Sequence, residues 1–500
     1  MEKVESLQKK IFNGIIWNYV QLFGNQLVSL IPTMVLTRIL SPSEYGLIAM
    51  AAIFTNVAFQ LADGGFGDAL IRKKDADHLD YCSFFYFNIT TCSFIYFILY
   101  YSAPFCASFF NDERLTAIIR ISGIGIILLA VGQIHSLIFR KNLEFRKPAV
   151  RNIVVQIISV VVAIIMAILG YGVWSLVVQG LIQTGLSSIV NWGISNWRPT
   201  WNFSFERLKL LFNYGSKRLM SSIIDYVFNK GYDIIIGRIY NPFSLAIYNR
   251  ACSTESLFSS TFFGVFNKVT FPIFVQMQDD EERLYYNVRR FLIISTMLIF
   301  TIMFLLIALA EPLFHFLYSS KWDATIPFFQ VVCVSGLFLP IVSIFEAVIL
   351  AKGEAAKFLK LSILRKFFIV IIILLTFQYG IVYMIMGQVF LRIVDILLLS
   401  YSIKFNIFQL IKDLLPYWIV ALLIAVTIYS FDAFLSIMLG YIKLGVFLSA
   451  FIRLTFGGLT SIFLFFKIYK SINTYGYKEF VIFLTNVLGP KIKYINFLIR

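Results

Sequence analysis

The chain has 500 residues, of which 59% are hydrophobic and 14% are charged. Soluble proteins carry about 25% charged residues, so this composition excludes a large soluble domain and indicates a polytopic membrane protein. The net charge of +16 would suit nucleic acid, but the basic residues cluster in loops between apolar segments, which is typical of a positive-inside bias. We therefore expect membrane lipids, and no nucleic acid, as partners.

The apolar segments predict an all-α membrane protein with fourteen transmembrane spans, because about 20 apolar residues cross the hydrocarbon core of a bilayer. The first six predicted spans cover 12–37, 43–71, 80–105, 114–139, 148–169 and 171–196. The next six cover 210–237, 244–275, 286–311, 325–350, 358–378 and 380–403. Two more lie near 414–434 and 440–466.

A repeated junction divides these spans into two lobes. Arg38-Ile39 followed by Pro42 returns as Arg238-Ile239 followed by Pro242, and two further short patterns recur in the same order. Each half contains six spans, which predicts a parallel repeat of two six-helix lobes. The predicted parts are an N-terminal lobe at 1–196, a cytoplasmic joint at 197–209, a C-terminal lobe at 210–403, two additional helices at 404–466 and a cytoplasmic basic tail at 467–500.

The basic residues also predict the orientation. With the N-terminus in the cytoplasm, the alternate segments on that side carry most of the lysines and arginines. The opposite side carries only Arg38, Arg114, Arg238, Lys321 and Lys443. Both termini are therefore predicted to be cytoplasmic.

The first junction has the signals of a helix start. Ser41 is suited to cap a helix, Pro42 to occupy its first turn, and Glu44 to complete a capping box. The helix that follows carries Asp63 and Asp68 in its second half, among glycines.

Enzyme motifs are nearly absent from the sequence, so neither catalysis nor a cofactor or metal is expected. It contains no Walker loop, dinucleotide fingerprint or HExxH motif, and its five cysteines show no metal spacing. Asp75-Ala76-Asp77 resembles the DxD of membrane glycosyltransferases, but a solvated loop is the favoured interpretation. His135 lies inside the fourth span, and a hydrogen-bonded helix contact is favoured over a proton-handling role.

Ionisable side chains inside the spans are the candidate functional residues, because a lipid-facing charge at mid-membrane is costly. The equivalent first pairs of spans in each half hold most of them, which predicts a cavity lined by these four spans. Candidate substrate-binding residues are Arg250, Lys230 and Lys268, with the polar stripe Asn18, Gln21 and Asn25. Candidate ion-coupling residues are Asp63, Asp225, Asp233 and Glu255. Structural pairing is an alternative for Lys230 with Asp233 and for Arg392 with Asp395.

Several stretches carry a family resemblance. LTRILSPSEYGLIAMAAIF, LADGGFGDALIRKKD, GYGVWSLVVQ at 170–179 and Trp197-Arg198-Pro199 resemble the polysaccharide transport branch of the multidrug/oligosaccharidyl-lipid/polysaccharide exporter superfamily. Within that branch the chain is most similar to Wzx-type lipid-linked oligosaccharide flippases, such as colanic and teichuronic acid exporters. The match covers the first 250 residues well, and the second half matches mainly in its pattern of spans.

The resemblance implies alternating access between the lobes and a substrate of undecaprenyl-pyrophosphate-linked oligosaccharide, moved across a bacterial inner membrane. It also implies a polysaccharide polymerase and glycosyltransferases of the same pathway as candidate partners. Two alternatives remain open. A cation-coupled multidrug antiporter would share the fold, but needs acidic residues to dominate its cavity. A polytopic glycosyltransferase or polymerase needs a large external loop, which the predicted spans do not leave.

Overall fold

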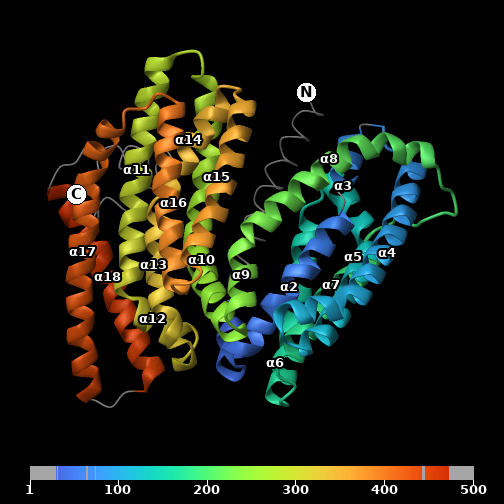
Figure 1. Cartoon of the computed structure of the whole chain (residues 1–500), viewed down its shortest axis with the longest axis horizontal. Coiled ribbons are helices and arrows are strands. Elements are labelled where there is room, and N and C mark those ends of the chain that lie inside the picture. The colour runs from blue at the N-terminus through green and yellow to red at the C-terminus, as the bar shows by residue number, and fades with distance from the viewer. Residues whose placement is uncertain (1–29, 31, 64–65, 74, 442–444, 472–500) are drawn as a thin grey trace. The chain divides into compact units, whose positions relative to one another are not determined.

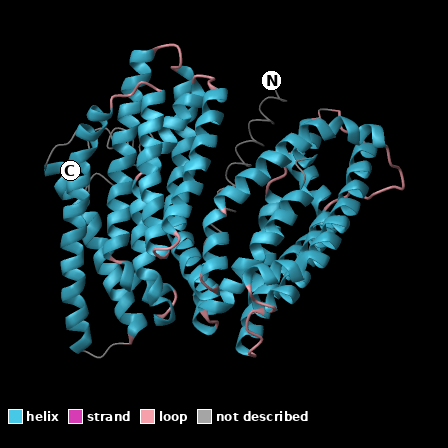
Figure 2. Ribbon diagram, in the orientation of Figure 1, coloured by secondary structure: helices cyan, strands magenta, loops and turns pink. Residues whose placement is uncertain are grey.

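The computed structural model describes residue 30 and residues 32–63, 66–73, 75–441 and 445–471, which form two compact units, Met1–Ala246 and Ile247–Arg500. The described residues are almost entirely α-helical and include one short 3₁₀ helix and no strand (Figure 2). The all-α class predicted from the apolar segments is therefore confirmed.

The first unit is a bundle of helices (Figure 1). Residues 32–39 are helical, and the elements that follow are α2 Pro42–Asp63, α3 Phe66–Arg72, α4 His78–Phe110, α5 Arg114–Lys141, α6 Arg146–Ile168, α7 Trp174–Ile194, α8 Phe205–Asn229 and α9 Gly231–Ile239. Within it, α5 packs against α4 and α7, and α7 also packs against α6. Helix α10, Pro242–Gln276, begins in this unit and continues into the second.

The second unit is built around α11. Its elements are α11 Glu281–Ala308, α12 Ala310–Leu317, η1 Ser320–Thr325, α13 Ile326–Leu337, α14 Leu339–Ala351, α15 Ala355–Thr376, α16 Ile381–Ser402, α17 Ile407–Tyr441 and α18 Val446–Ser471. Helix α11 is the most buried of the long apolar helices, because α12, α13, α14 and α17 all pack against it. Helix α18 packs on α12 and α17.

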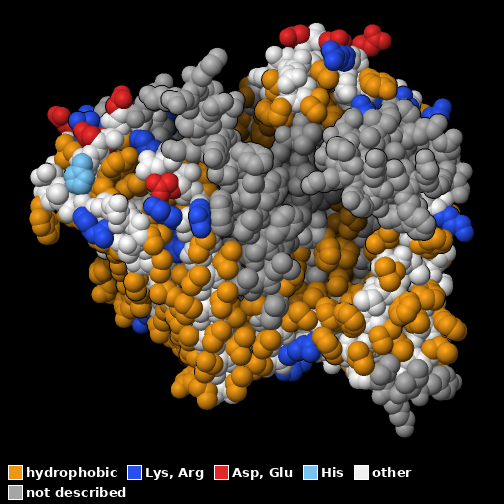
Figure 3. Space-filling view, turned by 180° about the vertical axis from the view of Figure 1, so that it is seen from behind, with side chains coloured by type: hydrophobic (Ala, Val, Ile, Leu, Met, Phe, Trp, Pro, Cys, Tyr) orange, Lys and Arg blue, Asp and Glu red, His pale blue; other side chains and the backbone are white. Residues whose placement is uncertain are grey.

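Nine helical segments in the described part of the chain are long and apolar enough to cross a membrane. Hydrophobic side chains cover broad areas of the face shown in Figure 3, and most charged side chains lie toward its upper edge. This pattern is typical of a surface that meets lipid. The total of fourteen spans, which includes one at 12–37 that lies largely outside the described residues, stays a prediction.

Two spans predicted as continuous are interrupted, and a third contains two residues that are not described. The span at 210–237 comprises α8 and α9, which meet at Lys230 before Gly231, and the span at 325–350 comprises α13 and α14, which meet at Phe338. Glycine and Pro340 explain these breaks, because both weaken a helix interior. The span at 43–71 comprises α2 and α3, with 64–65 outside the description. Non-helical backbone at membrane depth is tolerated where protein encloses it.

The predicted helix start at Ser41 is present in the structure. Helix α2 begins at Pro42, and the Glu44 carboxylate accepts hydrogen bonds from the Ser41 backbone N–H at 2.6 Å and from the Ser41 hydroxyl at 2.9 Å. Glu44 therefore accepts the hydrogen bond from the N-cap backbone, as a capping box requires. The Ser41 hydroxyl donates to the carboxylate, which differs from the reciprocal box.

The two junctions of the repeat meet at a glycine. A Cβ atom added to Gly46 in the first turns of α2 would lie 1.8 Å from the carbonyl oxygen of Pro242, the first residue of α10. Only a residue without a side chain allows this backbone approach. The proline of the second Arg-Ile-x-x-Pro copy therefore packs against the helix that begins with the proline of the first copy.

We expect Gly46→Ala to lower the yield of folded protein severely, because the added methyl group collides with backbone rather than with a flexible side chain. Size-exclusion chromatography of a fluorescent fusion measures this yield. Gly180→Ala in α7 is the matched control, since a Cβ there meets nothing within 4 Å. Equal yields of the two variants would contradict the close approach.

Candidate functional site

An ion-pair network lies inside the second unit, on α14, α15 and α16. Arg365 Nη1 lies 2.7 Å from Glu346 Oε1, and Arg365 Nε lies 3.0 Å from Asp395 Oδ1. The Asp395 side chain is only 4% exposed. Arg392, predicted from its spacing as the partner of Asp395, is at 3.8 Å. The intrahelical pair therefore exists, but the closer partner of Asp395 is Arg365, which sequence reasoning had placed among the cytoplasmic basic residues.

Glu255 is a buried carboxyl group on α10 in the same unit. It is 7% exposed, and a hydrogen bond from Ser259 and the charge of Arg392 both act on it. Its Oε1 atom has no hydrogen-bond partner among the described residues. A Cβ atom on Gly336 of α13 would lie 2.7 Å from this oxygen, so the glycine leaves room for the carboxyl group. A buried acceptor that is left unsatisfied is costly and calls for a functional explanation.

Arg250, the main candidate for contact with substrate, is held by aromatic rings. Its guanidinium carbon lies 5.0 Å from the ring centroid of Tyr318 and 4.8 Å from that of Trp322. The Tyr318 hydroxyl also shares a 2.7 Å hydrogen bond with Thr254 on α10. Cation–π contacts of this kind position a guanidinium without neutralising its charge.

Of the remaining candidate residues, some have described side chains and others do not. Lys230 Nζ lies 2.6 Å from Asp233 Oδ2, so the local pairing proposed for these residues is present, whereas Asp225 is exposed on α8. Asp63 is the last residue of α2 and Lys268 lies within α10, but their side chains are not described. The polar stripe of Asn18, Gln21 and Asn25 lies outside the described residues.

A polar cavity of about 370 Å³ lies within the first unit, between α5 and α7 and beside Arg151 of α6. We call it the Arg151 pocket. Its polar lining consists of Gln133, Ser136, Arg140, Arg151, Gln183, Thr184, Ser187, Ser188 and Asn191. Hydroxyl, amide and guanidinium groups in one cavity can hydrogen-bond both a sugar and an anionic group.

Arg151 is anchored by neutral groups. It donates hydrogen bonds to the side-chain oxygens of Asn152, Asn191 and Ser136, with a 3.3 Å contact to Ser136 Oγ. Asn191 also donates to Ser136 and to the Gly132 carbonyl, both at 3.0 Å. These acceptors hold the guanidinium in place without supplying a negative charge. The pocket therefore presents a positioned cation that suits an anionic ligand.

Sequence reasoning missed this pocket, because it counted Arg151 only among the basic residues on the cytoplasmic side, although residue 151 falls at the start of the predicted span 148–169. Arg151 lies inside α6, past its first turn. A usable signal was present on α7, where Gln183, Ser187 and Asn191 recur every four residues and so share one helix face. A polar face on an otherwise apolar helix indicates a polar cavity or a polar neighbour.

His135 does not make the hydrogen-bonded contact predicted for it. It is fully buried, and neither ring nitrogen has a hydrogen-bond partner among the described residues. Its ring packs edge-on against Trp192 at 4.9 Å and Trp197 at 5.6 Å. The tryptophans surround the imidazole with aromatic surface, so His135 packs the lobe interior.

Asp77 of the DxD-like stretch has a structural role. It caps α4: its Oδ1 accepts from the Asp80 N–H at 2.9 Å, and Asp80 Oδ2 accepts from the Asp77 N–H at 3.0 Å. Arg207 lies 3.3 Å from Asp77. The Asp80 N–H, and then the charge of Arg207, hold the pKa of Asp77 below its usual value. Asp75 and Asp77 are both exposed, as the solvated-loop interpretation predicts, and the capping box adds a structural role for Asp77.

These features define a class of protein: a polytopic α-helical membrane protein with polar and charged groups inside its bundles. The family described as "Polysaccharide biosynthesis protein" matches residues 35–327, so this chain belongs to that family. In the described part of the chain, no group of three His, Cys, Asp or Glu side chains could hold a metal ion.

Two curated relatives and two solved structures are similar to the chain. Teichuronic acid biosynthesis protein TuaB of Bacillus subtilis is 25% identical over 360 residues, covering 70% of this chain and 73% of the relative. Succinoglycan biosynthesis transport protein ExoT of Rhizobium meliloti is 24% identical over 357 residues, covering 71% and 72%. The solved lipid II flippase MurJ has a TM-score of 0.70 at 16% identity, covering 92% of this chain and 100% of that one. A multidrug resistance MATE family transporter has a TM-score of 0.55 at 14% identity, covering 80% and 99%. The structural likenesses show the shared fold.

We expect Asp77→Ala to lower the apparent melting temperature by about 1–3 °C, because α4 loses its cap. The folded-state pKa of Asp77 is lowered, so its contribution is full above the unfolded-state pKa and is lost as the pH falls through the folded-state pKa. The difference from the unmodified protein should therefore shrink on strong acidification. Asp75→Ala, which removes an exposed charge two residues earlier, is the control. An equal effect of both substitutions would contradict the capping role.

Proposed function

We propose that this protein flips undecaprenyl-pyrophosphate-linked oligosaccharide units across the bacterial inner membrane for surface polysaccharide synthesis, by alternating access of its two lobes. The observation that carries the proposal is the family match over residues 35–327. One relative, ExoT, is a succinoglycan biosynthesis transport protein, and a structural neighbour, MurJ, is a lipid II flippase, which supports transport rather than catalysis. Both termini lie in the cytoplasm in this proposal, and a polymerase and glycosyltransferases of the same pathway are partners.

The Arg151 pocket receives the anionic part of the substrate in this proposal. Arginine holds phosphate through two parallel hydrogen bonds, and the surrounding amides and hydroxyls suit a sugar. Arg250, Lys230 and Lys268, together with the polar stripe of Asn18, Gln21 and Asn25, contribute further contacts along the route. Arg250 in particular is positioned by Tyr318 and Trp322 rather than left mobile.

The alternatives are less well supported. A multidrug antiporter shares the fold, but the solved example is less similar in structure than the flippase. An antiporter for cations would also need acidic residues to dominate its cavity, whereas Asp233, Asp395 and Glu346 each have a basic partner and only Glu255 among the described candidates is buried without one. The glycosyltransferase alternative depended on the DxD-like stretch at 75–77. Asp77 of that stretch caps α4, so a structural role accounts for it.

Energy coupling requires a group whose ion or proton occupancy differs between inward and outward states. Asp63, Asp225, Asp233 and Glu255 were the candidates, and we propose Glu255. It is buried, and its Oε1 atom lacks a hydrogen-bond partner among the described residues. Asp233, by contrast, pairs with Lys230, and Asp225 is exposed.

The function is tested by reconstituting the purified protein in vesicles with a fluorescent undecaprenyl-pyrophosphate oligosaccharide and measuring its transfer between leaflets. We expect the unmodified protein to accelerate transfer and Arg151→Gln to slow it at least tenfold, since one charge-assisted contact contributes about 1.5–3 kcal/mol. Arg146→Gln, which removes an exposed arginine from the start of the same helix, should transport normally. Transfer no faster than in empty vesicles would overturn the proposed function.

For coupling, we expect Glu255→Gln to abolish the dependence of transport on an imposed proton or sodium gradient while substrate still binds. The amide keeps the shape of the side chain but cannot change charge. Glu282→Gln at the exposed start of α11 is the control. If Asp63→Asn loses gradient dependence and Glu255→Gln keeps it, the coupling group is Asp63 instead.

A further inference from the structure

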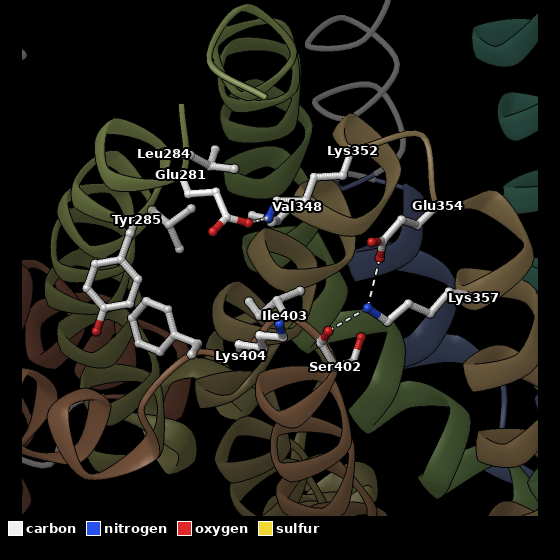
Figure 4. Close-up of a pocket in the computed structure, with 12 residues that line it drawn as sticks. Glu281, Leu284, Tyr285, Val348, Lys352, Glu354, Lys357, Ser402, Ile403 and Lys404 are labelled. Atoms are coloured by element: carbon white, nitrogen blue, oxygen red, sulfur yellow. Dashed lines mark hydrogen bonds and ion pairs between the residues drawn. The ribbon is translucent and has the colours of Figure 1, made fainter. Parts of the chain in front are cut away.

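A cavity of about 220 Å³ at one end of the second unit is lined by three lysines, Lys352, Lys357 and Lys404. We call it the lysine pocket. It lies where α11 begins, α14 ends and the chain turns from α16 into α17, and Figure 4 shows Lys352 and Lys357 on the same side of it. Glu281 and Glu354 also line it, so the five ionisable groups leave one net positive charge.

The three lysines differ in how firmly they are held. Lys357 Nζ donates to the Ser402 carbonyl at 2.5 Å and to Glu354 Oε2 at 2.8 Å, so it is fixed (Figure 4). Lys352 pairs at 3.1 Å with Glu281, whose side chain is 86% exposed. An ion pair so open to water is weak and is readily exchanged for another anion. Lys404 is exposed at the edge of the pocket.

A second cavity, an open groove of about 270 Å³, lies farther along α11, α14 and α16, and α17 completes its lining. Its entire lining is apolar and includes Phe300, Ile341, Leu397, Leu414 and Trp418. On α16, this lining begins at Leu397, about 7.5 Å from the Ser402 end by the rise of 1.5 Å per residue. A polar, cationic cavity is thus followed along the helices by an apolar one.

Aromatic side chains mark the level of the lysine pocket. Tyr285 stacks on Phe405 with ring centroids 4.7 Å apart, and both residues line the pocket. Tyr401 and Phe408, on either side of the turn, are 88% and 81% exposed. Aromatic rings and lysines gather at the membrane–water interface, so this end of the unit matches the level of lipid headgroups.

We propose that the second unit binds an anionic glycerophospholipid, with its phosphodiester in the lysine pocket and an acyl chain in the apolar cavity below. A phosphodiester carries one negative charge, which complements the net charge of the pocket, and basic pockets between transmembrane helices are typical headgroup sites. The lipid is a bound partner of the protein and not its transported cargo. This inference does not rest on the proposed function.

The first test measures lipid binding to the purified full chain in detergent by native mass spectrometry. We expect phosphatidylglycerol to bind in preference to phosphatidylcholine, and the double variant Lys352→Gln/Lys404→Gln to bind phosphatidylglycerol about tenfold more weakly. Lys360→Gln/Lys412→Gln removes the same charge from two exposed lysines that do not line the pocket, and should bind normally. Equal weakening by both pairs would reveal diffuse attraction and overturn the site.

The second test separates the lipid from a soluble phosphate. Leu397→Trp narrows the apolar groove and should reduce phosphatidylglycerol binding several-fold, whereas Leu374→Trp, at an exposed position of α15 outside the groove, should not. Glycerol 3-phosphate is the soluble probe, and we expect it to compete poorly. Competition by this probe at the concentrations at which the lipid binds, with no effect of Leu397→Trp, would assign the pocket to a free phosphate ester and refute the lipid proposal.

Discussion

The cost of a charge inside hydrocarbon explains how the second unit is built. An arginine at mid-membrane costs about 2.5–3.5 kcal/mol even on insertion scales. Arg365 meets this cost by pairing with Glu346 and Asp395, which come from the helices on either side of it in the chain. Because removing one member of such a network strands the others, the ion pairs specify how α14, α15 and α16 pack. The apolar surface alone would allow many arrangements.

In the first unit, the charge of Arg151 inside the bundle is held by neutral partners instead of carboxylates. Arg151 is held by asparagine and serine side chains, and Asn191 is itself held by Ser136 and the Gly132 carbonyl. Neutral acceptors hold a guanidinium in position but do not cancel its positive charge. The cavity beside it is polar, so an anionic ligand gains attraction there without first displacing a carboxylate. The two partly buried arginines therefore differ: Arg365 is paired with carboxylates, whereas Arg151 is held by neutral groups and can attract an anion.

The sequence predicts the features that depend on residues close together in the chain, and it does not predict contacts between distant segments. The length of an apolar run predicted α5 within two residues at its end, because a bilayer fixes that length. The Lys230–Asp233 pair was predictable, since three residues on a helix bring side chains together. The partners of Arg365, and the contact of Gly46 with Pro242, join distant segments. Charge counts along the chain carry no information on such packing, so Arg151 and Arg365 were counted only as basic residues of the cytoplasmic side.

The pairing pattern supports the proposed division between groups that bind substrate and groups that couple transport to an ion. Among the acids proposed for the spans, Asp233, Asp395 and Glu346 lie within ion-pair distance of a lysine or arginine. Glu255 keeps one oxygen without a hydrogen-bond partner in the described structure, and Gly336 provides the space that this oxygen occupies. A carboxyl group in that position gains an interaction when it binds a proton or a metal cation. We infer that a positioned cation in the first unit and an unsatisfied acid in the second divide substrate recognition from coupling.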